Sequence, residues 1–117
     1  RGRAANALAS VGGRSQMGGI RETHYTPSLT LDSLLDVFPV PSFIKIDIEG
    51  AELLSLLGAT NILSKARPSL YIETANKAEE IIALLASYNY FPQALDGSKI
   101  QKPYPYNILF MPQEAML

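Results

Sequence analysis

The stretch from Phe43 to Gly58 constrains the fold more than any other part of the chain. Isoleucine alternates with charged residues from position 44 to position 49, which is the two-residue period of a β-strand. A glycine follows at position 50, and after it leucines recur at helical spacing. The stretch therefore predicts a strand, a sharp turn and a helix, as in the first part of a β–α–β unit.

The predicted strand is unusual because one of its faces is charged. Ile44, Ile46 and Ile48 form the face expected to pack into the core. The opposite face carries Lys45, Asp47 and Glu49. A central parallel strand is normally apolar on both faces, since an unpaired buried carboxylate is strongly unfavourable. The charged face therefore needs either partners or a function.

The rest of the chain continues the alternation of helix and strand. The pattern predicts a helix at 28–38, a strand at 42–48, a helix at 50–66 interrupted at Gly58, a strand at 67–74, a helix at 76–90, and strands at 90–95 and 107–112. Thr30 or Asp32 is expected to cap the first helix. We expect an α/β fold with mostly parallel strands and a closing antiparallel strand, because no helix separates the last two strands. Residues 1–28, rich in Gly, Ser, Arg and Ala, are expected to form a flexible arm before a domain at 29–117.

Acidic residues are predicted to gather at one edge of the sheet. Asp47 and Glu49 end one strand, and Glu73 ends the next strand at the equivalent level. Open α/β sheets bind ligands at the carboxyl ends of their strands, so these residues and Lys45 are the candidate catalytic set. Close carboxylates raise at least one pKa, which suits acid–base chemistry or cation binding.

A purely structural interpretation of the same acids is also open. Glu49 and Glu52 stand near the start of a predicted helix, where the helix dipole favours negative charge. They could cap that helix and pair with Lys45 or Arg67. Under that interpretation the carboxylates stabilise the fold and take no part in chemistry.

Composition excludes several classes of function. Ten basic and 11 acidic residues give a net charge of -1, so no basic surface for nucleic acid is expected. The chain has no cysteine and one histidine, which excludes thiolate zinc sites, cysteine nucleophiles and multi-histidine metal sites. No apolar run approaches the ~20 residues that span a bilayer, and we expect a cytoplasmic protein with no membrane partner.

The motifs together resemble those of the FkbM-type methyltransferase family. They are Thr30-Leu31-Asp32, the Lys-x-Asp-x-Glu-Gly-x-Glu run from Lys45 to Glu52, Arg67-Pro68 before a strand that ends in Glu73, and a closing strand at 107–112. The resemblance covers residues 27–112 and implies a Rossmann-like enzyme that uses S-adenosylmethionine to methylate a hydroxyl of a sugar or other small molecule. It places Asp47 beside the cofactor and substrate crevice, with Glu49 and Glu73 nearby.

The resemblance also implies that part of the cofactor site is missing. Family members bind the cofactor through a first strand and a glycine-rich turn, and residues 1–28 contain neither. The chain therefore resembles the C-terminal half of the catalytic domain and is expected neither to bind the cofactor alone nor to be active alone. The strand at 43–48 would then have an unpaired edge, which predicts a homodimer or larger assembly, or pairing with the 1–28 arm.

Three functions remain open at this point. The chain could be a piece of a methyltransferase, in which Asp47 orients or deprotonates the acceptor. It could be a non-catalytic binding or assembly domain derived from that fold. It could also be a Mg²⁺-assisted enzyme that uses Asp47, Glu49 and Glu73 as oxygen ligands.

Overall fold

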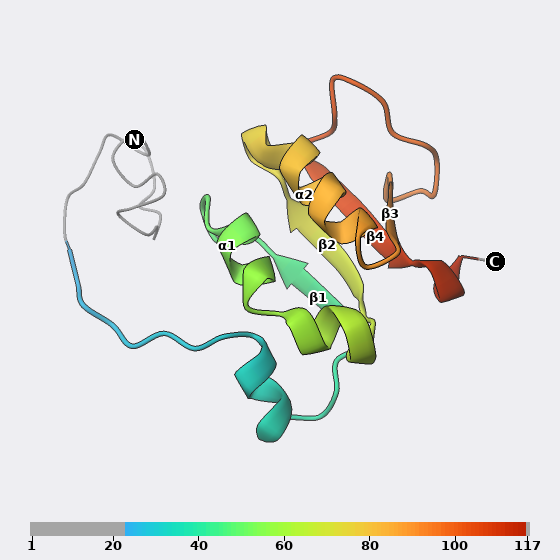
Figure 1. Cartoon of the computed structure of the whole chain (residues 1–117). Helices are drawn as coiled ribbons and strands as arrows, with labels where there is room; N and C mark the ends of the chain where they lie inside the picture. Colours follow the sequence, from blue (N-terminus) through green and yellow to red (C-terminus); the bar gives the residue numbers. More distant parts are fainter. Residues whose placement is uncertain (1–22, 117) are drawn as a thin grey trace.

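A four-stranded sheet with helices on one face makes up the core of the computed structural model, which describes residues 23–116 (Figure 1). The strands are β1 (Phe43–Ile46), β2 (Ser69–Glu73), β3 (Tyr90–Gln93) and β4 (Asn107–Pro112). The longer helical segments are α1 (Glu52–Leu57), the π-helical turn η3 (Ile62–Ala66) and α2 (Ala78–Ala86). Short 3-10 turns are η2 (Asp32–Asp36), η4 (Ala75–Lys77) and η5 (Gln113–Ala115). Most of the predicted arm at 1–28 lies outside the described residues.

The sheet is mixed, with the strand order β1-β2-β4-β3. β1 pairs with β2 in parallel, whereas β4 pairs antiparallel with both β2 and β3. The expectation of a mostly parallel sheet was therefore wrong, although the antiparallel pairing of the last two strands is confirmed. The physical reason is that β4 returns between β2 and β3 after the connection at 94–106. Periodicity finds a strand but does not tell which neighbours it will pair with.

The hydrophobic core lies between the sheet and the helices. Leu70 and Ile72 of β2 and Phe110 of β4 are buried in one cluster with side chains from α1, η3 and α2. All three helical segments therefore cover the same face, as Figure 1 shows. Among the described residues, no helix is long and apolar enough to cross a membrane. The other face of the sheet stays open, and Phe43 of β1 is 54% exposed there.

The Thr-Leu-Asp motif holds the first turn against the rest of the fold. The Thr30 hydroxyl accepts a hydrogen bond from the Ser33 amide at 3.2 Å, although the N-cap residue is Leu31 and the turn is 3-10 and not α-helical. The Asp32 carboxylate acts further away, because it accepts from the amides of Asn61 and Ile62 at 2.8 and 2.9 Å. Asp32 thus caps the start of η3 and joins two segments about 30 residues apart.

Gly58 interrupts the predicted helix at 50–66, as expected from the sequence. α1 ends at Leu57, and η3 begins at Ile62. The Gly58 carbonyl accepts a hydrogen bond from the Asp32 amide at 3.1 Å, which brings η2 close to the backbone of Gly58. A Cβ at position 58 would lie 3.2 Å from two side-chain atoms of Thr30. Close approach to Thr30, and not a left-handed conformation, therefore favours glycine here.

Arg67 fixes the opposite end of β2 from the acids. Its guanidinium makes two hydrogen bonds to the Glu114 carboxylate, at 2.8 and 2.9 Å. It also donates to the carbonyls of Leu63 and Tyr88 and lies 4.9 Å from the centre of the Tyr90 ring. The hydrogen bond to Glu114 raises the pKa of Arg67. The suggested pairing of Arg67 with the acids of the motif was therefore wrong.

Candidate functional site

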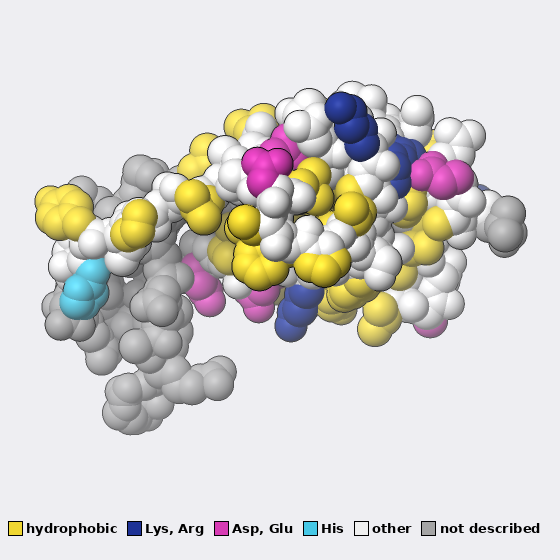
Figure 2. Space-filling model, turned by 90° about the horizontal axis from the view of Figure 1, so that it is seen from below, with side chains coloured by type: hydrophobic (Ala, Val, Ile, Leu, Met, Phe, Trp, Pro, Cys, Tyr) yellow, Lys and Arg dark blue, Asp and Glu magenta, His cyan; other side chains and the backbone are white. Residues whose placement is uncertain are grey.

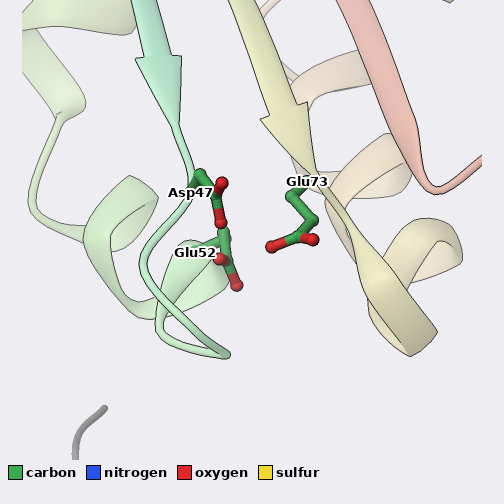
Figure 3. Close-up of side chains that lie close together, drawn as sticks. All are labelled: Asp47, Glu52 and Glu73. Atoms are coloured by element: carbon green, nitrogen blue, oxygen red, sulfur yellow. The ribbon is translucent and has the colours of Figure 1, made fainter. Parts of the chain in front are cut away.

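The candidate site lies where β1 and β2 end side by side. Ile46 is the last residue of β1, and the parallel register places it beside Ile72 of β2. The next residues along the two strands are Asp47 and Glu73, so the pairing brings both carboxylates to one edge of the sheet. Figure 3 shows them facing each other, with Glu52 of α1 beside them. The predicted convergence of the Asp47 and Glu73 carboxylates is present in the structure.

A tight loop separates β1 from α1 and gives the site its shape. Glu49 has a φ of 58°, and Gly50 has a φ of 102°, so the chain reverses direction through two left-handed residues. The strand therefore ends two residues earlier than predicted, at Ile46. Ile48, expected on the core face, is instead 41% exposed because it belongs to this loop.

Glu52 holds the loop in place. Its side chain is 3% exposed, and its two oxygens accept hydrogen bonds from the amides of Ile48, at 2.8 Å, and Gly50, at 3.1 Å. The sequence suggested that Glu52 caps the helix or pairs with a basic residue. Neither suggestion describes its contact with the loop amides. The useful signal in the sequence was the short spacing from the Glu-Gly pair to the next acid. That spacing lets a helix-start carboxylate reach back to the loop amides.

The acidic cluster has a marked electrostatic consequence. One oxygen from each of Asp47, Glu52 and Glu73 lies within 4.8 Å of the others. A hydrogen bond with Asp47, partial burial and repulsion from Asp47 raise the pKa of Glu73 to about 7. Repulsion from Glu49 and Glu52 adds smaller contributions in the same direction. The pair can therefore hold or release a proton near neutral pH.

The other two members of the predicted set lie at the margin of the cluster. Glu49 is partly buried in the loop and acts on Glu73 through charge repulsion. Lys45 is exposed on β1. Within residues 23–116 the ion pairs are Arg67–Glu114 and Lys102–Glu79, so Lys45 does not form the neutralising ion pair with the acids that the sequence suggested.

A shallow hollow opens just beyond the end of β2. It has a volume of about 330 Å³ and begins two residues after Glu73. Its lining residues are Ala75, Asn76, Ala78, Glu79, Glu80 and Tyr104. Sequence reasoning missed this hollow, because Tyr104 reaches it from the connection before β4. An amide, carboxylates and an aromatic ring offer hydrogen bonds and a flat surface to a small polar molecule.

A metal ion and a nucleotide cofactor each need a particular set of residues, which the described part of the chain supplies only in part. Asp47, Glu52 and Glu73 are oxygen ligands of the kind that Mg²⁺ prefers, but both Glu52 oxygens already accept hydrogen bonds from loop amides. The glycines at 23–116 are Gly50, Gly58 and Gly97, and none belongs to a glycine-rich turn. The described part of the chain therefore does not fit the phosphate- or nucleoside-binding turn of a nucleotide cofactor.

The fold and the acidic cluster are compatible with a methyltransferase domain, and comparison with protein families gives the same answer. The methyltransferase FkbM domain matches residues 3–92 of the chain. The chain therefore belongs to the FkbM methyltransferase family, whose members generally use S-adenosylmethionine. The match begins nearer the start of the chain than the motifs indicated, and it includes most of the predicted arm. Neither the curated proteins nor the solved structures yielded a match to the chain.

Proposed function

We propose that the chain supplies the acceptor-activating part of an S-adenosylmethionine-dependent methyltransferase that acts on a hydroxyl of a sugar or other small molecule. The observation that carries this proposal is the pairing of Asp47 with Glu73 at the carboxyl ends of parallel strands, with the pKa of Glu73 raised to about 7. A group that titrates near neutral pH is the most effective general base at that pH. Membership of the FkbM family supplies the reaction class.

The two carboxyl groups have distinct roles in this proposal. The acceptor hydroxyl donates a hydrogen bond to the Asp47–Glu73 pair, and its proton passes to a carboxylate oxygen as the hydroxyl oxygen becomes the nucleophile. The hydrogen bond between the two side chains then stabilises the protonated pair. Glu52 keeps the loop after Asp47 in position through its two amide contacts. The hollow lined by Asn76 and Tyr104 would receive the rest of the acceptor.

The same proposal assigns the cofactor to a part of the site that residues 23–116 do not provide. The described glycines form no cofactor turn, and among residues 23–116 no strand pairs with the outer edge of β1. A chain with only the acceptor side of the site is expected to be inactive by itself, because methyl transfer depends on positioning both reactants.

Titration calorimetry of the 117-residue chain with S-adenosylmethionine tests this division of the site. We expect no binding heat, and no rise in melting temperature with ligand in large excess. Tight binding would overturn the division and would place the cofactor on this chain. In that case the transfer of a labelled methyl group to a panel of sugars should be measured for the unchanged chain and for the Asp47→Asn variant. Full activity of that variant would refute the role of the carboxylate pair.

A non-catalytic assembly domain is the second candidate, and one observation favours it. Nine of the thirteen large hydrophobic side chains exposed in the described residues lie between positions 25 and 57. Val37, Phe38 and Val40 are more than 60% exposed in the connection that leads to β1. Figure 2 views the molecule from below relative to Figure 1 and shows hydrophobic side chains on that face.

A further inference from the structure

The connection between β3 and β4 is attached to the end of β2, where the hollow begins. Thr74 follows Glu73 and is buried, and its amide donates a hydrogen bond to the Tyr106 carbonyl at 2.8 Å. The Thr74 hydroxyl donates to the same carbonyl at 3.3 Å. The sheet register continues this contact, since Asn107 lies opposite Glu73. The last residues of the connection are therefore fixed to the strand end that carries the carboxyl pair.

An ion pair holds the same connection against the start of α2. The Lys102 ammonium lies 2.5 Å from the Glu79 carboxylate. Tyr104 follows two residues later, is partly buried and lines the hollow together with Glu79 and Glu80. Figure 1 shows the connection reaching the start of α2. Two attachments, one to β2 and one to α2, thus keep Tyr104 in the wall of the hollow.

The lining of the hollow is acidic and aromatic, and no basic side chain is part of it, not even that of Lys77 in the adjoining turn. Lys102 is already paired with Glu79. Within residues 23–116 Glu80 forms no ion pair, so its charge is available to a ligand. A carboxylate beside an aromatic ring binds an ammonium group through charge-assisted hydrogen bonds and cation–π attraction. The same side chains repel a phosphate or a carboxylate.

We propose that the hollow binds the ammonium group of an amino sugar whose reacting hydroxyl lies at the Asp47–Glu73 pair. This inference rests on the proposed function, because it takes that pair as the place where the acceptor hydroxyl is deprotonated. Ala75, in the lining, follows Glu73 by two residues, which is at most about 7 Å along the backbone. One small acceptor can therefore reach both places.

Three lining side chains divide the recognition of this acceptor among them. Glu80 attracts the ammonium group, Tyr104 offers a flat face to the sugar ring, and Asn76 exchanges hydrogen bonds with its hydroxyls. A volume of about 330 Å³ is near the lower end for ligand pockets, which suits a single sugar ring. The family match ends at residue 92, so it does not reach Tyr104 and does not fix the acceptor.

Titration of the full ¹⁵N-labelled chain with glucosamine at pH 6, followed by two-dimensional NMR, tests the proposal without cofactor or methyl transfer. We expect saturable shifts of the Asn76, Glu80 and Tyr104 amides, with a dissociation constant on the order of 1 mM. Glucose lacks the ammonium group and should bind about 3-fold more weakly. Glucose 6-phosphate should not shift these amides. Equal binding of glucose and glucosamine, or binding of the phosphate, overturns the proposal.

Substitutions in the hollow separate charge from shape. Glu80→Gln keeps the shape and removes the unpaired charge, so it should weaken glucosamine about 3-fold and leave glucose unchanged. Tyr104→Ala removes the aromatic face and should weaken both sugars, whereas Tyr104→Phe should bind them as the unchanged chain does. Asp36→Asn is the matched control, because it removes the same charge from η2. Equal effects of Glu80→Gln and Asp36→Asn would mean that net charge attracts the amine, and the proposal would be wrong.

The same titration distinguishes a failure of this inference from a failure of the proposed function. Shifts confined to the surroundings of Asp47 and Glu73 would mean that the amine binds the carboxyl pair, which overturns the hollow as its site. Absence of any shift also overturns this inference, but it leaves the role of the carboxyl pair as a base untouched. The proposed function fails instead if Asp47→Asn keeps full methyl-transfer activity, whichever sugar binds.

Discussion

Replacing Asp47 with asparagine should stabilise the protein above pH 7 and change its stability little near pH 4. The pKa of Glu73 is about 7 in the folded protein against an ordinary 4.5. Between these values the folded protein binds more protons than the unfolded chain. Its free energy of unfolding therefore falls as the pH rises through that window. The chief cause of the raised Glu73 pKa is its interaction with the Asp47 carboxylate. Asparagine at position 47 should therefore remove most of the stability loss between pH 4.5 and 7.

The size of the effect follows from the same two values. The interval from 4.5 to about 7 corresponds to about 3 kcal/mol without screening. Glu73 is only partly buried, so water screens the repulsion, and about 1 kcal/mol is the expected gain at pH 8. For a domain of this size that gain is a rise of roughly 5 °C in melting temperature.

Thermal unfolding followed by circular dichroism at pH 4, 6 and 8 measures this difference directly. Asp36→Asn is the matched control, since it removes the same charge from an exposed residue of η2. The control should show no pH-dependent gain. An equal gain in both variants would mean that net charge is the cause. If the Asp47 variant keeps the loss of stability between pH 4.5 and 7, the carboxyl pair is not coupled as described.

Five further substitutions test contacts that hold the site and the fold. Glu52→Gln keeps one acceptor oxygen and should cost about 2 kcal/mol in denaturant unfolding, with faster exchange of the loop amides. Arg67→Lys cannot reproduce the two-pronged contact and should destabilise the chain by about 1–2 kcal/mol in the same assay. Because Arg67 lowers the pKa of Glu114 to about 2, the unchanged protein should lose stability as the pH falls from 4.5 toward 2, and Glu114→Gln should reduce that loss. Gly58→Ala should cost about 1 kcal/mol through crowding against Thr30, and adding Thr30→Ser should recover part of it in a double-mutant cycle.

The sequence predicted the elements of this fold better than their arrangement. The last strand has the bounds expected at 107–112, and the interruption at Gly58 is where the pattern placed it. Local periodicity and glycine chemistry are sufficient for such features. The insertion of β4 between β2 and β3 depends on contacts between segments far apart in the chain, which a local pattern does not encode. The parallel character of the sheet was therefore overestimated.

The candidate site shows the same division between local and distant information. Asp47 and Glu73 were predicted to meet because parallel neighbouring strands end at one edge, and that rule holds here. A structural role for Glu52 was one of the open interpretations, but its contacts with the loop amides were not predicted, because they depend on a loop with two residues at positive φ. Loop geometry of this kind follows from the hydrogen bonds that hold it, and not from periodicity.

The motif residues that identify the family fall into two physical groups, and this matters for any mutational test of function. Asp47, Glu49 and Glu73 lie at the carboxyl ends of the strands, where their charges interact. Asp32 and Arg67 lie elsewhere and connect distant segments through backbone and carboxylate contacts. Variants of the second group should therefore lose stability, whereas variants of the first group should keep it. A measured gain in stability for Asp47→Asn would therefore support the proposal that this carboxylate is kept for chemistry at a cost to the fold.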